Sequence, residues 1–390
     1  MNFRISLMLL FVLAICGCKE VAKEKVAGEK STGEGTITST GYWIPEHVEE
    51  IKDMKGWGPY VRLEDGNLLT VNANKSMISK DEGKTWTEEH AIFTDSTKYS
   101  IGSPVMIRTT KNIIILAFSN GAEMANWNWN NTTHDSPGAT LPTYVVRSLD
   151  GGKTWQDLQK LHSEWTGMIR DIIETKDGSV VFTSMKMLHN PGRHTVMTYT
   201  SSNGGVKWVP SNIIDLGGIG NHSGVMESTL VQLKDGTLWM ILRTNWGNFW
   251  QAFSNDEGWT WKEFAPTNID ASSSPGIIHR LNSGRLVFIW NRLYPEGKKE
   301  YTMRPGDNNL AEVPASWQRE EVSMMLSDDD GNTWTKPVVI AKAHADKKKW
   351  MSYPYIFEVK PGELWITMLQ CDLRIKLNEK DFVTAQTGTK

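Results

Sequence analysis

Cysteine is scarce in this chain of 390 residues, which contains only Cys16, Cys18 and Cys371. Two of the three lie at the N-terminus, and if that segment is processed, the rest of the chain has one thiol and forms no intrachain disulfide. No cluster of Cys and His has the spacing of a zinc site. We therefore expect a protein that folds and acts without disulfides, bound metal or any other cofactor.

Positive charge is not in excess either, because 42 Lys and Arg against 45 Asp and Glu give a formal net charge of −3. Proteins that bind nucleic acid usually have a basic footprint, so the composition argues against nucleic acid as a partner. Helical periodicity is nearly absent, and residues 45–52 form the one segment with a weak helical pattern. The chain also has 18 Trp, which supply core or sugar-stacking surfaces. These features predict a β-rich protein.

The N-terminal hydrophobic run is short. Residues 5–15 are apolar and follow a basic start at residues 1–4, a pattern too short to cross a bilayer and typical of a signal peptide. The next residues, Ile15-Cys16-Gly17-Cys18, resemble a bacterial lipoprotein box with Cys18 as the lipidated residue. Ordinary secretion with cleavage nearby is the alternative. We expect an exported protein that is lipid-anchored to the bacterial outer membrane.

Composition divides the rest of the chain into three parts. Residues 19–40 are charged, rich in Gly, Ser and Thr and poor in bulky apolar side chains, as in a flexible tether. Residues 41–382 suit one large repeat domain. Residues 383–390 form a tail. The expected organisation is a signal peptide over residues 1–18, a tether, one folded domain and a tail, and we expect a monomer.

One motif, Ser-x-Asp-x-Gly-x-Thr-Trp, recurs along the domain at intervals of 69, 53, 53 and 73 residues. Its copies are residues 79–86, 148–155, 254–261 and 327–334, with a degenerate copy at 201–208. Asp and Gly favour turns, the hydroxyl groups close local hydrogen bonds, and Trp adds apolar surface. The acidic residues 328–330 are also typical of a calcium loop, but the distal Glu of an EF-hand is missing. The five copies therefore predict a structural turn in an array of like units.

Six pairs of short strand patterns accompany these motifs, each pair joined by a tight turn that contains Gly or Asn. The pairs cover residues 60–71, 105–118, 169–183, 229–242, 277–290 and 355–368. Short strands at regular intervals are typical of four-stranded blades around an axis. The sixth unit lacks its own motif, and we expect the strand pattern near residues 37–44 to complete it. The fold class predicted is all-β, a six-bladed β-propeller.

Propeller topology also sorts the residues between two faces. The tight turns and the repeat motifs lie on one face, and the longer connections lie on the other, where function is usually found. The candidates on that second face are Asp135, Arg170, His222, Glu227, Arg243, Arg319 and Tyr353.

The motif copies are similar to the Asp-boxes of bacterial sialidases, and the resemblance extends to these candidates. Residues 227–233, followed by Arg243, resemble the sialidase blade with a glutamate and one arginine of the carboxylate-binding triad. Arg319, eight residues before a motif, stands where another triad arginine is expected. Tyr353 resembles the tyrosine nucleophile, and Asp135 lies in a loop similar to that of the acid/base aspartate. The resemblance implies a retaining exo-glycosidase that hydrolyses a terminal acidic sugar.

The resemblance also implies a role for each residue. Because the carboxylate of a sialic acid would repel a carboxylate nucleophile, a neutral Tyr353 hydroxyl would attack while Glu227 draws off its proton. Asp135 would protonate the leaving oxygen and then activate water. Arg243 and Arg319 would hold the substrate carboxylate through charge-assisted hydrogen bonds.

The chain departs from the sialidase pattern at the first triad arginine. The family has this arginine two residues before a proline, whereas the matching stretches here are Trp57-Gly58-Pro59 and Gly102-Ser103-Pro104. Arg170, at the start of the third inner strand, is the best substitute by topology. Asp135 falls in the second unit and not in the unit of the first arginine. The expected substrate is therefore sialic acid or a related acidic sugar, such as a uronic or keto-acid sugar.

Two other functions stay open on the same scaffold. A polysaccharide lyase would use Tyr353 with His222 or His134 to abstract a proton beside a uronate carboxylate. A non-catalytic glycan-binding lipoprotein would account for the missing arginine. In each case the expected partner is an acidic glycan or oligosaccharide.

Overall fold

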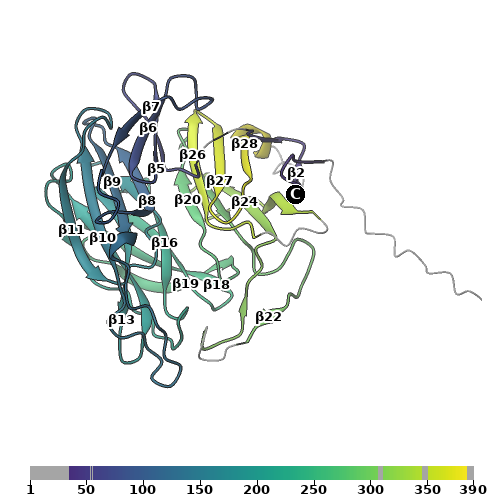
Figure 1. Ribbon diagram of the computed structural model, residues 1–390. Helices are drawn as coiled ribbons and strands as arrows, with labels where there is room; N and C mark the ends of the chain where they lie inside the picture. The colour runs from purple at the N-terminus through teal and green to yellow at the C-terminus, as the bar shows by residue number, and fades with distance from the viewer. Residues whose placement is uncertain (1–34, 53, 55, 306–310, 345–349, 384–390) are drawn as a thin grey trace, which may run out of the picture. The chain divides into compact units, whose positions relative to one another are not determined.

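Antiparallel sheets account for nearly all regular structure in the part of the chain that can be described (Figure 1). This computed structural model describes residues 35–52, 54, 56–305, 311–344 and 350–383. The predicted signal peptide with Cys18 and most of the predicted tether lie outside these residues. Over the described ranges, no helix has the length and hydropathy needed to cross a membrane.

The first four blades each use four consecutive strands, paired in chain order. Blade 1 consists of β4 (Tyr60–Arg62), β5 (Leu68–Asn72), β6 (Lys75–Ser79) and β7 (Glu88–Ala91). Blade 2 consists of β8 (Ile101–Arg108), β9 (Ile114–Asn120), β10 (Thr140–Ser148) and β11 (Gln156–Glu164). Blade 3 consists of β12 (Ile172–Glu174), β13 (Val180–Leu188), β14 (Arg193–Ser201) and β15 (Val209–Pro210). Blade 4 consists of β16 (Met226–Gln232), β17 (Leu238–Arg243), β18 (Asn248–Ser254) and β19 (Lys262–Asp270).

The last two blades combine strands from both ends of the chain. Blade 5 consists of β20 (Ile277–Arg280), β21 (Leu286–Trp290), β24 (Glu321–Ser327) and β25 (Val338–Ala343), extended by β2 (Tyr42–Pro45) and β1 (Gly35–Ile37). Blade 6 consists of β26 (Pro354–Lys360), β27 (Glu363–Met368), β28 (Arg374–Asn378) and β3 (Val48–Glu50). The small hairpin β22 (Met303–Arg304) and β23 (Ala315–Ser316) belongs to a long connection of blade 5. Two 3₁₀ turns are η1 (Gly121–Glu123) and η2 (Glu379–Phe382).

The N-terminal strands differ from two of our predictions. The segment near residues 37–44 pairs with β25 of blade 5, with Tyr42 opposite Ala343, and does not complete blade 6. Blade 6 is completed by β3, which pairs with β28, and this strand occupies the segment with the weak helical pattern. Val48 is buried there. Tertiary pairing overrides the weak local preference of so short a segment.

The innermost strands form a closed ring. β4 contacts β8, and contacts continue in turn through β12, β16, β20 and β26, which returns to β4. The apolar cores lie between neighbouring blades, as where Leu69 and Val71 of blade 1 pack in one cluster with Leu116 and Phe118 of blade 2. The six-bladed β-propeller that the sequence predicts is confirmed.

The repeat motif is a hydrogen-bonded turn that joins neighbouring blades. In blade 4, the Ser254 hydroxyl donates to Asp256 Oδ1 at 2.8 Å, and Asp256 Oδ1 accepts from the backbone N–H of Thr260 at 2.8 Å. The carbonyl of Gly258 in the same motif accepts from the hydroxyl of Thr198 in blade 3 at 2.8 Å. In the degenerate copy, Asn203 accepts the equivalent backbone bond at 2.9 Å. The motif is therefore structural.

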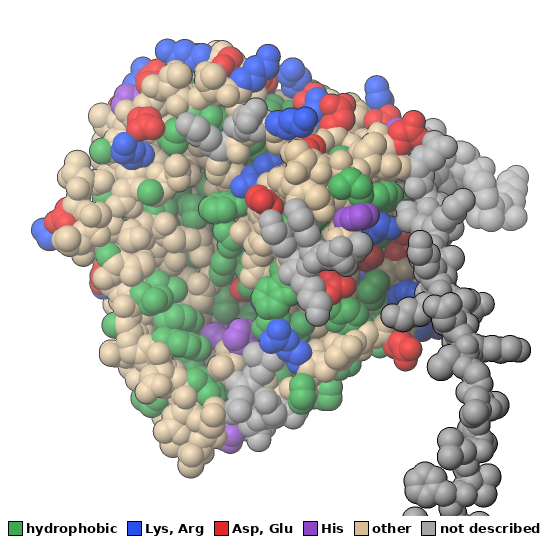
Figure 2. All heavy atoms as spheres, turned by 45° about the vertical axis from the view of Figure 1, so that its right-hand side comes forward, with side chains coloured by type: hydrophobic (Ala, Val, Ile, Leu, Met, Phe, Trp, Pro, Cys, Tyr) green, Lys and Arg blue, Asp and Glu red, His purple; other side chains and the backbone are tan. Residues whose placement is uncertain are grey.

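The repeat motifs and the tight turns share one face of the propeller, as predicted. The N–H of Lys234, in the first turn of blade 4, donates to Asp330 Oδ2 in the motif of blade 5 at 2.7 Å. On the side in view in Figure 2, charged side chains of both signs are interspersed with exposed hydrophobic ones. The candidate site is built at the other ends of the inner strands.

Candidate active site

The candidate residues come from four blades but occupy equivalent places in them. Glu227 lies at the start of β16 and Arg243 at the end of β17, and these two strands pair antiparallel. Tyr353 directly precedes β26, the inner strand of blade 6. Arg170 and Arg319 precede β12 of blade 3 and β24 of blade 5. All five therefore belong to the same face, opposite the repeat motifs.

Glu227, Tyr353 and Arg243 form a hydrogen-bonded group. The Tyr353 hydroxyl donates to Glu227 Oε1 at 2.9 Å, and Arg243 Nη1 donates to Glu227 Oε2. Arg243 Nη1 also lies 3.3 Å from the Tyr353 hydroxyl oxygen. Arg243 is 1% exposed, so this ion pair is shielded from solvent. The carboxylate is placed to accept the tyrosine proton.

The backbone at both Glu227 and Tyr353 is left-handed, with φ of 37° and 61°. Residues other than Gly seldom adopt these angles, and such conformations gather at functional sites. At Glu227 the strand pairing between β16 and β17 is interrupted by a register shift after Met226. This irregularity turns the Glu227 side chain away from the regular alternation of the strand.

Opposite shifts in pKa keep the pair in the state needed for proton transfer. Burial, and then the Glu227 charge, raises the pKa of Tyr353, so the phenol stays protonated. Burial acts to raise the pKa of Glu227 too, but the charge and hydrogen bond of Arg243 outweigh it and lower the pKa overall. The resting pair is a neutral phenol against an ionised carboxylate.

Three arginines surround the tyrosine. The guanidinium carbons of Arg170 and Arg319 lie 5.5 and 5.6 Å from the centre of the Tyr353 ring, and Arg243 contacts its hydroxyl. Burial, and then the Arg243 charge, lowers the pKa of Arg319 to about 10, so it remains a cation at neutral pH. The structure thus brings Arg170 to Tyr353 together with Arg243 and Arg319. Three cations around one carboxylate leave a net positive site for an anion.

Two residues that were not predicted from the sequence, Ser273 and Gln370, hold these arginines. Arg243 Nη2 donates to Ser273 Oγ at 2.9 Å, and Arg319 Nη2 donates to the Ser273 carbonyl at 2.7 Å. Gln370 Oε1 accepts from Arg319 Nη1 at 2.8 Å. Ser273 lies in a run of three serines just before β20, on the same face as the arginines. This run is the sequence feature from which a role for Ser273 could have been predicted. No comparable sequence pattern marks Gln370.

His222 lies at the edge of the same site. Its ring centre is 5.8 Å from that of Trp317, whose indole lies 4.7 Å from the Arg319 guanidinium. Its Nδ1 forms a 2.7 Å hydrogen bond with the Asn221 side-chain oxygen, and Asn245 Nδ2 donates to its carbonyl at 2.6 Å. Burial, and then the Arg243 charge, lowers the pKa of His222 to about 4. His222 is therefore neutral at pH 7.

Among the described residues, Asp135 is hydrogen-bonded outside this group, and its predicted role as the acid/base stays a prediction. It is buried, and its carboxylate accepts from His189 Nδ1 at 2.7 Å, from the Asn190 N–H at 3.1 Å and from the Ser136 N–H at 2.7 Å. Among the described residues it forms no hydrogen bond with Glu227 or Tyr353. His134 belongs to the same local structure, because its carbonyl accepts from the Gly192 N–H at 2.7 Å. This loop fastens blade 2 to the β13–β14 turn.

An apolar cavity of about 240 Å³ lies beside Tyr353 and Arg170. Both stretches that lack the family's first arginine line it, through Gly58, Pro59 and Ser103. Trp57, Ile101, Met168 and Leu369 complete much of the wall. The two stretches therefore border a mainly apolar cavity that Arg170 and Tyr353 also line.

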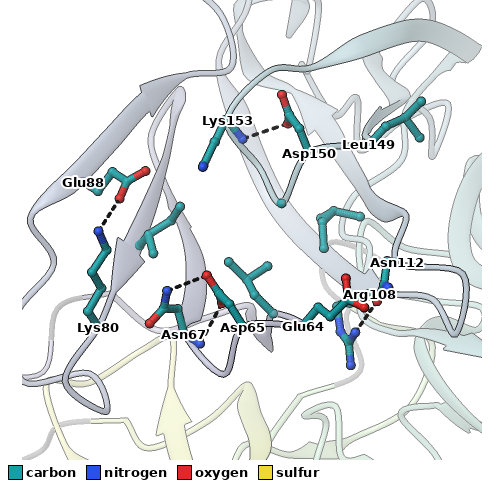
Figure 3. A pocket seen from close by; sticks show the side chains of 14 residues that line it. Glu64, Asp65, Asn67, Lys80, Glu88, Arg108, Asn112, Leu149, Asp150 and Lys153 are labelled. Atoms are coloured by element: carbon teal, nitrogen blue, oxygen red, sulfur yellow. Dashed lines mark hydrogen bonds and ion pairs between the residues drawn. The ribbon is translucent and has the colours of Figure 1, made fainter.

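A second cavity, on the repeat-motif face between blades 1 and 2, does not have the features of a reaction site (Figure 3). Its polar side chains pair with one another, as where Lys80 contacts Glu88 at 3.1 Å and Asn67 donates to Asp65 at 2.7 Å. Asp150, from the motif of blade 2, is bound within its own turn. These side chains hold the turns together.

The fold and the site define a sialidase-like β-propeller. Residues 62–366 match the family described as BNR repeat-like domain, and the chain belongs to that family. A sialidase of Clostridium perfringens is 29% identical over 240 residues, which cover 53% of this chain and 60% of that relative. The resemblance to bacterial sialidases that the sequence predicts is confirmed.

Solved structures show the same fold at low identity. The NanB sialidase from Streptococcus pneumoniae matches with a TM-score of 0.54 and 12% identity over 86% of this chain and 70% of that one. A Dyadobacter fermentans protein of unknown function gives a TM-score of 0.54 and 14% identity over 85% and 98% of the two chains. A Penicillium chrysogenum alpha-L-arabinanase gives a TM-score of 0.55 and 11% identity over 90% of this chain and 100% of that one. These likenesses show the fold alone.

Proposed function

We propose that this protein is a retaining exo-glycosidase that releases a terminal acidic sugar from a glycan. The observation that carries the proposal is the hydrogen bond between Tyr353 and Glu227 within a cluster of three arginines. The Clostridium perfringens relative is named a sialidase, which supports the same reaction class.

In the proposed first step, the Tyr353 oxygen attacks the anomeric carbon as its proton passes to Glu227. The 2.9 Å contact suits this transfer, and the ionised state of Glu227 makes it the acceptor. A neutral nucleophile suits a sugar with a carboxylate next to the reacting carbon, because it avoids repulsion between like charges.

Arg170, Arg243 and Arg319 would bind the substrate carboxylate. Each is held by other groups before substrate arrives, with Arg170 Nη2 donating to the Pro354 carbonyl at 2.7 Å. Preorganised, buried cations form stronger charge-assisted bonds than exposed ones, because little water competes. The positive cluster supports selection of acidic over neutral sugars.

The test is a panel of aryl glycosides of N-acetylneuraminic acid, a second keto-acid sugar and glucuronic acid, with an arabinofuranoside as the neutral control. We expect release from at least one acidic glycoside and none from the arabinofuranoside, and the first product should keep its anomeric configuration by NMR. Cleavage of the neutral glycoside alone would contradict the acidic-sugar assignment. Tight binding of an acidic sugar without any release would identify a glycan-binding protein instead.

A polysaccharide lyase is the second candidate, favoured by the neutral His222 beside Arg243 and Arg319. A lyase needs cations to neutralise a uronate carboxylate, a base to remove the adjacent proton and an acid for the leaving oxygen. His222 would be the base and protonated Tyr353 the acid. Uronate oligosaccharides separate the candidates, because a lyase yields an unsaturated product that absorbs ultraviolet light and a hydrolase does not.

A further inference from the structure

The proposed hydrolysis needs a proton donor for the leaving oxygen, and Asp135 is engaged elsewhere. Its carboxylate accepts three hydrogen bonds, one from the side chain of His189 and two from backbone N–H groups. The His189 bond joins it to the β13–β14 turn and not to Tyr353. These three bonds satisfy the buried carboxylate within its own loop and the neighbouring turn.

Glu312 is another carboxylate on this face, in the long connection of blade 5, and its Oε2 is buried without a hydrogen-bond partner among the described residues. Its Oε1 accepts from Trp246 Nε1 at 2.9 Å, and its N–H donates to the Ser223 hydroxyl at 3.2 Å. Glu227 is taken up by Tyr353 and Arg243. A titratable group of another type, His222, also lies on this face, with its ring packed against Trp317.

His222 lies at the edge of the arginine cluster, beside the Trp317 ring that packs on the Arg319 guanidinium. Its Nδ1 is bound to the Asn221 oxygen, which accepts, so Nδ1 carries the hydrogen and Nε2 has the lone pair. Nε2 forms no hydrogen bond with any residue that the structure describes. Two contacts hold the residue in place, the Asn245 bond to its carbonyl and the packing of its ring against Trp317.

We propose that His222 transfers the proton at the leaving oxygen in place of an aspartate, an inference that rests on the proposed hydrolysis. In the first step the imidazolium gives the proton on Nε2 to the oxygen as the glycosidic bond breaks and Tyr353 binds the anomeric carbon. In the second step water attacks that carbon and loses a proton to Nε2. The Tyr353–carbon bond breaks in that same step, and the phenolate takes its proton back from Glu227.

The charges that face His222 make its protonation depend on substrate. Arg243, Arg319 and His194 lower its pKa and Glu227 raises it, with burial as the largest effect. A substrate carboxylate bound among the arginines cancels part of this positive field, so the pKa of His222 rises on binding. The acid form is needed for the first step, and activity on poor leaving groups should therefore be greatest at acidic pH.

The experiment compares two leaving groups in the wild-type protein and the His222→Gln variant. The substrates are the 4-nitrophenyl and methyl glycosides of N-acetylneuraminic acid and of glucuronic acid. A methoxide leaving group needs a proton and a nitrophenolate does not. We expect His222→Gln to lower kcat/KM for the methyl glycoside by about 10²–10⁴-fold and for the nitrophenyl glycoside by less than about 10-fold.

Three variants make the result decisive. His90→Gln, the same substitution far from the site on β7, should leave both rates unchanged. Asp135→Asn should lower the unfolding temperature and reduce both rates by one common factor, because its role is structural. Asn221→Asp should move the acidic optimum for the methyl glycoside to higher pH, since a carboxylate beside Nδ1 stabilises the imidazolium.

The outcomes separate this inference from the function it rests on. If the wild-type protein cleaves neither glycoside of either sugar, the hydrolase proposal fails. If it cleaves them but His222→Gln slows both leaving groups equally, or Asp135→Asn alone shows the leaving-group effect, the hydrolase stands and the role of His222 is refuted.

Discussion

Glu227 and Tyr353 are 126 positions apart in the chain, yet their side chains share a 2.9 Å hydrogen bond and both have left-handed backbones. The two residues come from blades 4 and 6, so only ring closure brings them together. The strained angles at both positions fix the side chains before any ligand binds. This relationship supports our proposal that the reaction takes place on the face opposite the repeat motifs.

Tyr353→Phe removes the oxygen that we propose as the nucleophile and leaves the ring between its arginines. We expect kcat to fall by about 10³-fold or more, with binding of the acidic sugar largely retained because the three cations are unchanged. Steady-state kinetics and calorimetric titration with the free acidic sugar measure the two effects. Turnover equal to that of the wild type would exclude Tyr353 as the nucleophile.

Glu227→Gln keeps the shape of the side chain but removes the charge that Arg243 and Arg170 face. Because it leaves buried cations without their partner, we expect a loss of about 3–5 kcal/mol in the free energy of unfolding at pH 7. The pKa of Glu227 is lowered in the folded state, so its contribution is fully present above the unfolded pKa of about 4.3 and is lost as the pH falls through the folded value.

Urea unfolding at several pH values checks this prediction. The difference between wild type and Glu227→Gln should shrink below about pH 4. If the free energies of unfolding of the two proteins differ by the same amount at pH 3 and at pH 7, the carboxylate charge does not contribute to stability. The variant should also lose turnover by about 10²–10⁴-fold, as expected for a missing base.

The fold could be predicted because the sequence motif that indicates it is local and occurs in several copies. Each motif contains the groups that close its own turn, so residues such as Asp256 and Asn203 need no distant partner. The pairing of the N-terminal strands was harder to predict, because β2 and β3 have only a few residues each. Their partners, β25 and β28, come near them only when the ring of blades has formed.

The site could be predicted in part, for a related reason. Glu227, Arg243 and Tyr353 are marked by their places at the ends of inner strands, which the repeat spacing defines. Asp135 lies in a loop similar to the one that contains the acid/base aspartate in sialidases. His189 of another blade binds its carboxylate, and no local sequence pattern predicts that contact. Gln370 was missed likewise, because its role depends on Arg319 lying beside it.

Arg170→Gln tests whether this residue replaces the arginine that the chain lacks. Losing one charge-assisted hydrogen bond to the substrate carboxylate should raise KM for an acidic glycoside by about 10–100-fold, with a smaller change in kcat. The matched control is Arg62→Gln, at a half-buried arginine that pairs with Glu82 on the other face. Equal effects of the two substitutions, measured by steady-state kinetics, would rule out a binding role for Arg170.

Asp256 in the motif of blade 4 tests the structural role of the repeat. Its carboxylate accepts from the Ser254 hydroxyl and from the Thr260 N–H, bonds that the Asn203 side chain also forms in the degenerate copy. Asp256→Asn should therefore cost about 1 kcal/mol or less, whereas Asp256→Ala leaves backbone donors unpaired and should cost about 2–3 kcal/mol. Thermal and urea unfolding measure both variants, and glycosidase activity per folded molecule should stay unchanged. Loss of activity without loss of stability in either variant would mean that the motif acts in the chemistry after all.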